Sequence, residues 1–409
     1  MKKTVFIGVL MGIFVSCQSS DKKQVQKTIK PSQIESHVSY NKEDIILGAE
    51  RIADYIKDFQ NKRIALVVNQ TSVIGTSHLV DTFQAIGVNI KKVFAPEHGF
   101  RGNHSAGAII SNGVDIKTGL PVVSLYGKNK KPTAEMLHDV DIVVFDIQDV
   151  GVRFYTYIST MHYVMEACAE LGKQVIILDR PNPNGFYIDG PVLEKEYSSF
   201  IGMHPIPIVH GLTVGELALM INGERWLKGE VFCDLKVVGC KNYAHDLLYE
   251  LPIKPSPNLP NMNSIYLYPY LGLFEGTNVS VGRGTTKPFQ IIGRPGMQGD
   301  TSFIPESIPG VSDHPKYESK ECKGFVVDDV NNPSFFTNGG LNLSWLKLFY
   351  DNNSVNEGEY FKSFIYKLCG TKSLKTQIEQ GLSEEKIKES WQEDLDKYKE
   401  MRKKYLLYP

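Results

Sequence analysis

The strongest candidate for acid–base chemistry is a glutamate that follows a predicted strand. Glu97 and His98 belong to the segment Ala95–Gly102 (APEHGFRG), directly after the apolar run Ile90–Ala95. A carboxyl group can give or take a proton, and a neighbouring His98 or Arg101 can favour one of its protonation states. The two glycines of the segment let the backbone approach a ligand closely. The alternative is a loop glutamate in a surface ion pair.

Two aspartates lie where another apolar run ends. Asp146 and Asp149 belong to the segment Phe145–Tyr157 (FDIQDVGVRFYTY), and Arg153 follows four residues after Asp149. A buried carboxylate needs a partner, so one aspartate could pair with Arg153 or cap the helix expected near Thr156. The alternatives are catalysis or a divalent metal, because paired aspartates bind such ions. No further ligand cluster accompanies them in the sequence, and we predict neither a metal nor a cofactor.

A third polar segment contains two asparagines between prolines. In Asp179–Gly185 (DRPNPNG) the prolines restrict the loop. The amides of Asn182 and Asn184 can hydrogen-bond sugar hydroxyls or acetamido groups. The alternative is a turn built from Asn and Pro. His210, after the apolar run Ile206–Val209, could line the same cleft.

The fourth region combines both charges with small polar residues. It runs through PSPNLP, with Asn258, and then LFEGTNVSVGRGTT, with Glu275, Asn278 and Arg283. Gly282-Arg283-Gly284 is not a dinucleotide motif, since no strand, following helix or third spaced glycine accompanies it. The guanidinium of Arg283 suits an anionic carboxylate, which it can bind through two parallel hydrogen bonds.

These polar segments follow an alternation of predicted strands and helices. Continuous apolar runs predict strands buried on both faces, and helices follow from apolar spacing and terminal residues. Strands are expected at Arg63–Asn69, Ile90–Ala95, Pro121–Tyr126, Ile142–Ile147 and Val175–Leu178, and helices at His78–Ile86, Thr133–Asp139, Tyr157–Leu171 and Val214–Gly223. Thr213 and Glu216 have the spacing of a capping box for the last helix. The alternation predicts an α/β fold: a Rossmann-like parallel sheet with helices on both faces, whose ligands bind beyond the carboxyl ends of the strands.

The pattern changes in the second half of the chain. Residues 254–296 are rich in Pro, Gly and Asn and show little periodicity, which predicts a functional loop system. Residues 297–409 contain a short strand, Gly324–Val327, and helices, the last over Glu384–Tyr405. We therefore expect a catalytic domain over residues 44–296 and a smaller C-terminal α+β auxiliary domain over residues 297–409.

Charge and cysteine content exclude some classes of function. The chain has 45 basic and 46 acidic residues, so no basic excess is available to neutralise a nucleic-acid backbone. Five cysteines follow residue 17, without a CxxC pair or zinc-like spacing to histidines. Cysteine chemistry is therefore not the expected function.

The N-terminus has the pattern of a targeting signal. Lys2 and Lys3 precede an apolar run, Val5–Val15, that is too short to span a bilayer, and Ser16-Cys17 follows. This arrangement resembles a bacterial lipoprotein signal over residues 1–17, with Cys17 as the lipidated residue. Residues 18–43 are polar and predict a tether. The expected location is the cell envelope, lipid-anchored and periplasmic or associated with the outer membrane.

Taken together, the motifs resemble the exo-β-N-acetylmuramidase family of the NamZ type. The resemblance covers about residue 44 to the C-terminus, in one collinear order. It is carried by APEHGFRG (95–102), TGLPVVSLYG (118–127), VDIVVFDIQDVGVRFYTYISTM (140–161), LDRPNPNG (178–185), VHGLTVGELA (209–218), PSPNLP (255–260), LFEGTNVSVGRGTTKPF (273–289) and KYLLY (404–408).

The resemblance implies release of N-acetylmuramic acid from the non-reducing ends of peptidoglycan fragments, in a cleft between a Rossmann-like and a smaller domain. It places Glu97 at the position of the family's catalytic glutamate, and the other catalytic candidates are His98, Asp149 and Glu275. The lactyl carboxylate and the acetamido group of this sugar need cations and amides. The substrate-binding candidates are Arg101, Asp146, Arg153, Tyr155, Arg180, Asn182, Asn184, His210, Asn258, Asn278 and Arg283. The expected partners are small saccharides or muropeptides and, through the lipid anchor, a membrane.

Overall fold

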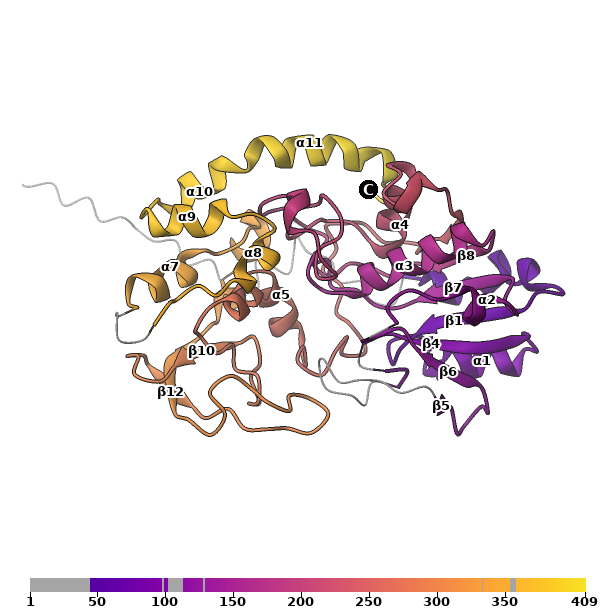
Figure 1. The fold of residues 1–409 in the computed structure, drawn as a ribbon, viewed down its shortest axis with the longest axis horizontal. Helices are drawn as coiled ribbons and strands as arrows, with labels where there is room; N and C mark the ends of the chain where they lie inside the picture. The colour runs from indigo at the N-terminus through magenta and orange to yellow at the C-terminus, as the bar shows by residue number, and fades with distance from the viewer. Residues whose placement is uncertain (1–44, 98, 102–112, 128, 333, 354–357) are drawn as a thin grey trace, which may run out of the picture. The chain divides into compact units, whose positions relative to one another are not determined.

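The computed structural model describes residues 45–409 apart from 98, 102–112, 128, 333 and 354–357 (Figure 1). The predictions made for His98, for the lipidation of Cys17 and for the signal and tether segments lie outside the described residues. No helix of the described part is long and apolar enough to cross a membrane.

A seven-stranded sheet forms the first part of the fold (Figure 1). In spatial order its strands are β5 (Gly113–Val114), β6 (Pro121–Ser124), β4 (Ile90–Ala95), β1 (Ile64–Val68), β7 (Ile142–Asp146), β8 (Gln174–Leu178) and β9 (Asp234–Val238). All neighbours are parallel except β5, which runs antiparallel to β6. The chain adds β4 and β6 on one side of β1 and then returns to add β7, β8 and β9 on the other side. This is the order of a doubly wound sheet, whose ligands bind at the carboxyl edge near the reversal.

Helices cover both faces of this sheet, because alternate strand residues point to opposite sides. On one face, Val67 and Phe145 belong to a core with α3 (Tyr157–Glu170) and α4 (Val214–Gly223). On the other face, Leu66 packs in a second core that includes α1 (Leu79–Ala85). The predicted Rossmann-like α/β fold is confirmed, as is the capping box in which Thr213 Oγ1 accepts from the Glu216 N–H. The remaining helix of this part is α2 (Ala134–Leu137), and β2 (Val73–Ile74) and β3 (Ser77–His78) form a small hairpin.

A smaller α+β region follows, also as predicted. Its sheet has the order β10 (Ile291–Arg294), β12 (Cys322–Val326), β11 (Thr301–Phe303) and is antiparallel. Its described α-helices are α5 (Met262–Leu271), α6 (Ser334–Asn338), α7 (Ser344–Asp351), α8 (Phe364–Cys369), α9 (Ser373–Glu379), α10 (Glu384–Ser390) and α11 (Gln392–Arg402). The 3₁₀ helices of this part are η7 (Gly272–Gly276), η8 (Asp329–Asn331) and η10 (Lys403–Tyr405).

Two predictions for this region were wrong. Residues 254–296 are not only loops, because they contain α5 and η7. Every residue of α5 from Ser264 to Leu271 is buried, so the helix shows no polar face and no helical periodicity in the sequence. The single helix expected over Glu384–Tyr405 is divided at Trp391, whose buried indole Nε1 donates to Asp189 Oδ1 over 3.1 Å.

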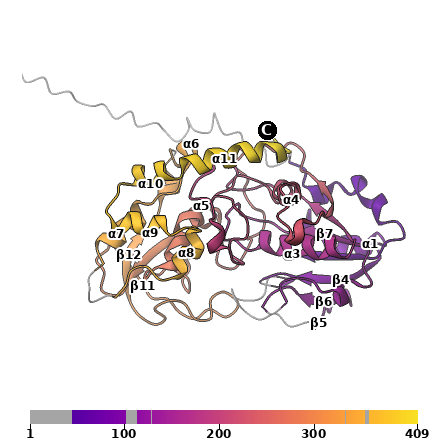
Figure 2. The same ribbon diagram turned by 45° about the horizontal axis from the view of Figure 1, so that its top comes forward.

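The C-terminal end of the chain returns to the sheet. In both views α11 extends to the side of α4 (Figures 1 and 2). The hydroxyl of Tyr398, on α11, donates to His210 O over 2.6 Å, and the hydroxyl of Tyr408 donates to Asp179 Oδ2 over 2.6 Å. The two regions are therefore joined by buried hydrogen bonds and not only by the chain between them.

Candidate active site

A pocket of about 430 Å³ lies beyond the carboxyl ends of β4 and β6 and is lined by residues from several segments of the chain. Its lining combines carboxylates, cations and aromatic rings. The lining residues are Glu97, Tyr126, Lys130, Phe154, Tyr155, Thr156, Tyr157, Ser199, Phe200, Ile201, Ser256, Asn258, Leu259, Tyr268, Glu275, Arg283, Phe289, Phe364, Lys367 and Leu368. The strand-end loops, the segment before α3 and the later helices α5, η7 and α8 all contribute.

Glu97 is the carboxylate that the sheet itself presents to the pocket. It follows the end of β4 by two residues and is half-buried. Its Oε2 accepts a hydrogen bond from Thr156 Oγ1 over 2.9 Å. Burial, and then the charge of Glu97, raise the pKa of the Tyr126 phenol, which stands at the end of the neighbouring strand β6. The carboxylate is thus held between two hydroxyl side chains while it faces the pocket.

Glu275 is the second carboxylate of the described pocket lining, and it is paired with Arg283. Arg283 Nε donates to Glu275 Oε1 over 2.7 Å and its Nη2 to Oε2 over 3.3 Å. The guanidinium carbon also lies 4.9 Å from the ring centroid of Phe289. The Nε–Nη2 edge of the Arg283 guanidinium is therefore already occupied by a carboxylate of the protein.

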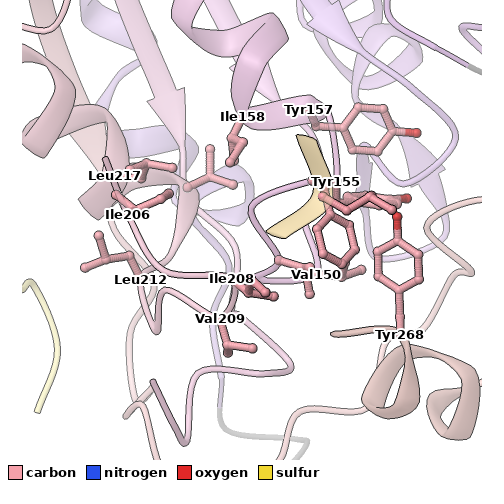
Figure 3. Close-up of a cluster of buried hydrophobic side chains, with 14 of the residues drawn as sticks. Val150, Tyr155, Tyr157, Ile158, Ile206, Ile208, Val209, Leu212, Leu217 and Tyr268 are labelled. Carbon is pink, nitrogen blue, oxygen red and sulfur yellow. The ribbon is translucent and has the colours of Figure 1, made fainter. Parts of the chain in front are cut away.

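Aromatic rings form one wall of the pocket. The Tyr155 ring packs edge to face against Tyr157 at 5.0 Å and against Tyr268 at 5.9 Å between centroids. Figure 3 shows these three tyrosines on one side of the core cluster and aliphatic residues such as Leu217 on the other. Flat rings of this kind can pack against the apolar faces of a sugar.

Three polar atoms of the pocket lining are buried and have no partner among the described residues. They are the hydroxyl oxygens of Tyr155 and Ser199 and the Oδ1 of Asn258. The amide nitrogen of Asn258 donates to Val311 O over 2.7 Å, which fixes the orientation of Oδ1. Buried polar groups without a partner are costly, so they indicate a place where a ligand supplies the missing hydrogen bonds.

Asp149 lies near this wall but does not line the pocket. One oxygen accepts from the Gly151 N–H over 2.7 Å, and Oδ1 has no partner among the described residues. Burial raises the pKa of Asp149 to about 7, against the backbone hydrogen bonds from Gly151 and Val150. Together with burial, which has the larger effect, the charge of Asp149 raises the pKa values of Tyr155, Tyr157 and Tyr268. Asp149 is therefore placed to influence the aromatic wall rather than to contact a ligand directly.

Comparisons with known proteins show the family of the chain. The family model for the N-terminal part of the exo-β-N-acetylmuramidase NamZ matches residues 64–263, and the model for its C-terminal part matches residues 266–408. The chain belongs to the NamZ family. The two models meet inside the predicted loop system, and the domain boundary at residue 296 stays a prediction.

A curated relative supports the same assignment. The chain is 39% identical over 430 residues to the peptidoglycan β-N-acetylmuramidase NamZ of Bacillus subtilis (strain 168), with all of both chains covered. Two crystal structures of DUF1343 family proteins from Bacteroides fragilis NCTC 9343 have the same fold. One is 47% identical with a TM-score of 0.82 and the other 32% identical with a TM-score of 0.73. Each comparison covers 89% of this chain and 99% of the relative.

Several of the predicted binding residues of this NamZ-family chain are placed elsewhere by the structure. Arg180 binds Asp146 with both Nε and Nη2, over 2.6 and 2.9 Å, and the pair is buried. The alternative in which an aspartate pairs with Arg153 is contradicted, because the described partners of Arg153 are carbonyl oxygens. Arg153 is buried, and its guanidinium donates to four backbone carbonyl oxygens from both regions of the fold. These are the carbonyl oxygens of Pro191, Ile206, Leu368 and Cys369.

The predicted asparagines and His210 also make internal contacts. Asn182 Nδ2 donates to Leu212 O over 2.9 Å. Asn184 Nδ2 donates to Val150 O over 2.8 Å and to Ile265 O over 3.2 Å. His210 is buried, and its Nδ1 accepts from the Leu212 N–H. The amides therefore build the loop, as in the alternative stated from the sequence, and none of these three side chains lines the pocket.

Two further candidates are not among the lining residues of the pocket. Asn278 Nδ2 donates to Asn353 Oδ1 over 2.8 Å. Arg101 binds Asp115 with two hydrogen bonds of 3.0 and 2.8 Å, in an ion pair near the sheet edge. Of the described candidates, Glu97, Tyr155, Asn258, Glu275 and Arg283 line the pocket.

The sequence analysis missed other lining residues. Tyr126 ends the predicted strand at Pro121–Tyr126, so its place at the carboxyl edge could have been inferred. Lys130, Phe200 and Lys367 have no such signal, because they reach the pocket through contacts between segments distant in sequence. No group of three or more possible metal ligands occurs among the described residues.

Proposed function

We propose that this protein is an exo-acting glycoside hydrolase that releases N-acetylmuramic acid from the non-reducing end of peptidoglycan fragments. The observation that carries the proposal is a pocket with two carboxylates, Glu97 and Glu275, beside unpaired buried polar atoms, in a NamZ-family chain. Glycoside hydrolysis commonly uses two carboxyl groups on either side of the bond that breaks.

Glu97 is the proposed general acid. Its protonated carboxyl would give a proton to the glycosidic oxygen as the bond from that oxygen to the anomeric carbon breaks. The hydrogen bond from Thr156 orients the carboxyl group. Water then supplies the hydroxyl of the released sugar, and a proton returns to the enzyme.

Glu275 is the proposed second carboxylate. Arg283 holds this carboxylate in place through two hydrogen bonds, and an anion is what the positive charge that develops on the sugar ring requires. In this assignment Arg283 acts through Glu275. The sequence suggested that Arg283 binds the carboxylate of the substrate. We therefore assign that contact to another residue.

The unpaired atoms suit the acetamido group and hydroxyls of the sugar. Asn258 Oδ1 can accept from an amide N–H, and the hydroxyls of Tyr155 and Ser199 can donate to a carbonyl oxygen. The cavity has the volume of a small-molecule site, which suits the end of a saccharide chain.

Product analysis tests the proposal. The enzyme should cleave a disaccharide with N-acetylmuramic acid at its non-reducing end and leave intact one that ends in N-acetylglucosamine. It should also hydrolyse a chromogenic N-acetylmuraminide in the presence of EDTA. Binding of these sugars without turnover would identify a binding protein and refute the proposal.

We also propose that the protein is lipid-anchored in the cell envelope. The support is the charged and apolar N-terminus followed by Cys17. A palmitate analogue should label the full-length protein and not its Cys17→Ser variant, and globomycin should block processing. Processing that is insensitive to globomycin would contradict the proposal.

A further inference from the structure

Three cations line the described part of the pocket: Lys130, Arg283 and Lys367. The substrate of the proposed function carries an anionic lactyl carboxylate, which distinguishes it from N-acetylglucosamine. Arg283 is engaged by Glu275 through its Nε and Nη2 groups, and the carboxylate compensates its charge. A second carboxylate bound to the remaining N–H groups would be repelled by the negative charge of Glu275, so a lysine is the better candidate.

Lys130 is held in place by an aromatic stack. Its Nζ lies 4.2 Å from the ring centroid of Phe200. Phe200 in turn stacks on Tyr163 of α3, with 6.1 Å between centroids and an angle of 9° between ring planes. A ring face attracts an ammonium group without neutralising its charge. The ammonium of Lys130 is therefore positioned while its charge remains available.

The backbone on both sides of this stack is fixed as well. Ser199 and Gly202 exchange two backbone hydrogen bonds of 2.9 Å, so Phe200 stands in a tight turn. Lys131, the next residue after Lys130, forms ion pairs with Glu166 and Glu170 of α3 over 2.7 and 2.8 Å. The charge of Lys131 is thus compensated, and its contacts hold the segment that presents Lys130.

Ser199 adds a second donor on the same wall. Its Oγ is buried without a partner among the described residues, directly before Phe200. An ammonium and a hydroxyl group are suitable donors for the two oxygens of a carboxylate. Lys367, in contrast, is exposed on α8. Fixed donors lose less conformational entropy on binding than a free surface lysine does.

We propose that Lys130, held on Phe200, binds the lactyl carboxylate of N-acetylmuramic acid and so determines the specificity of the pocket. This inference rests on the proposed function for the identity of the sugar. It assigns specificity to the turn Ser199–Gly202 and the segment before α2, rather than to the Glu275–Arg283 pair.

The test compares two sugars that differ only in the lactyl ether. Binding of N-acetylmuramic acid and N-acetylglucosamine is measured calorimetrically in the wild type and in Lys130→Met, Lys130→Arg and Lys386→Met, the last being an exposed lysine of α10. Lys130→Met should weaken N-acetylmuramic acid about 10- to 100-fold, as expected for one charge-assisted contact, and leave N-acetylglucosamine within about twofold. Lys130→Arg should recover most of the loss, and Lys386→Met should bind both sugars as the wild type does.

Enzyme kinetics test the role of Lys130 independently of the binding measurements. With a chromogenic N-acetylmuraminide, Lys130→Met should raise KM by the same factor and change kcat by less than about threefold. Equal weakening of both sugars would make Lys130 structural and overturn the proposal, as would an unchanged affinity for N-acetylmuramic acid. A loss of discrimination in Lys367→Met, with none in Lys130→Met, would also overturn it. If the wild type hydrolyses no muraminide, the proposed function fails, while the binding comparison still decides the role of Lys130.

Discussion

Two clusters of polar residues stand at the carboxyl edge of the same sheet, and only one of them faces the pocket. The open cluster is Glu97, Tyr126 and Thr156, at the ends of β4 and β6 and before α3. The closed cluster is Asp146, Asp179, Arg180, Asn182 and Asn184, at the ends of β7 and β8. Both consist of the residue types that bind sugars, and both follow buried strands.

The clusters differ in where their hydrogen bonds go. In the closed cluster Asp146 binds Arg180, and Asp179 accepts from the hydroxyls of Thr213 and Tyr408. The open cluster lies next to the unpaired atoms of Tyr155 and Asn258. Asn184 Oδ1 is an exception in the closed cluster, since it has no partner among the described residues. Apart from it, the closed cluster satisfies its own hydrogen bonds and builds the fold, whereas the open cluster lies beside unpaired atoms of the pocket lining, where a ligand can bind. The following predictions test this distinction, beginning with the largest expected effect.

Replacing the acid of the open cluster should stop turnover without unfolding the protein. Glu97→Gln keeps the shape of the side chain but cannot transfer a proton, so kcat should fall by about 10²–10⁴ with KM nearly unchanged. The measurement is hydrolysis of a disaccharide that ends in N-acetylmuramic acid, with the thermal midpoint of unfolding as the control for folding.

The leaving group sharpens this test. A nitrophenolate needs little protonation, so Glu97→Gln should recover much of its rate on a nitrophenyl N-acetylmuraminide if Glu97 is only the acid. If nothing is recovered, Glu97 is the nucleophile or base instead. Activity of the variant at the wild-type level on both substrates would remove Glu97 from the mechanism.

Replacing a carboxylate of the closed cluster should have the opposite outcome. Asp146→Asn leaves the buried guanidinium of Arg180 without its counter-charge, which should destabilise the fold by about 3–5 kcal/mol. Urea unfolding measures the loss, and kcat per folded molecule should stay near the wild-type value. An intact fold combined with a large loss of kcat would place Asp146 in the catalytic machinery and end the distinction between the clusters.

The sequence could predict the edge of the sheet but not which cluster would be open. The strand Ile90–Ala95 and the helix Val214–Gly223 were predicted with the bounds that the structure has, because burial on both faces and a capping box leave clear signals. The partners of Asp146 and Arg153 leave no such signal. Arg153 reaches Leu368 and Cys369, more than 200 residues away in the sequence, and only the folded chain brings them together.

The walls of the pocket were hidden for the same reason. Glu275 and Arg283 could be selected from their unusual surroundings of Gly, Asn and Thr, but their mutual ion pair could not. Lys130 stands in a short basic stretch of the sequence. Its neighbour Lys131 has the same charge, and only the contacts with Glu166 and Phe200 distinguish the compensated lysine from the available one.

Glu275 and Arg283, which form an ion pair in the pocket lining, should act as a unit. Arg283→Ala should lower kcat/KM for the N-acetylmuraminide by about one to two decades, because Glu275 loses the two charge-assisted hydrogen bonds that hold it in place. A cycle with Glu275→Gln checks this: if Arg283 acts through Glu275, the double variant should be little worse than Glu275→Gln alone. Additive losses would show that Arg283 contacts the substrate by itself.

The smallest expected effect concerns stability in acid and belongs to the interior around the closed cluster. Burial, and then the charges of Arg402 and Arg153, lower the pKa of His210 to about 3. In the unfolded chain the pKa of a histidine is about 6.5, so between these values the unfolded state binds a proton that the folded state does not. The stability that neutral His210 allows is therefore complete above pH 6.5 and is lost as the pH falls towards 3. At pH 5 the loss amounts to about 2 kcal/mol relative to pH 7.5.

His210→Asn keeps an acceptor for the Leu212 N–H but does not titrate, so its free energy of unfolding should depend on pH less steeply by that amount. His162 and His204, whose pKa values burial also lowers, remain in both proteins and cancel in the difference. Urea unfolding at the two pH values measures it. Equal pH dependence in the two proteins would mean that His210 becomes protonated within the fold and that this interior is open to water, contrary to the comparison drawn above.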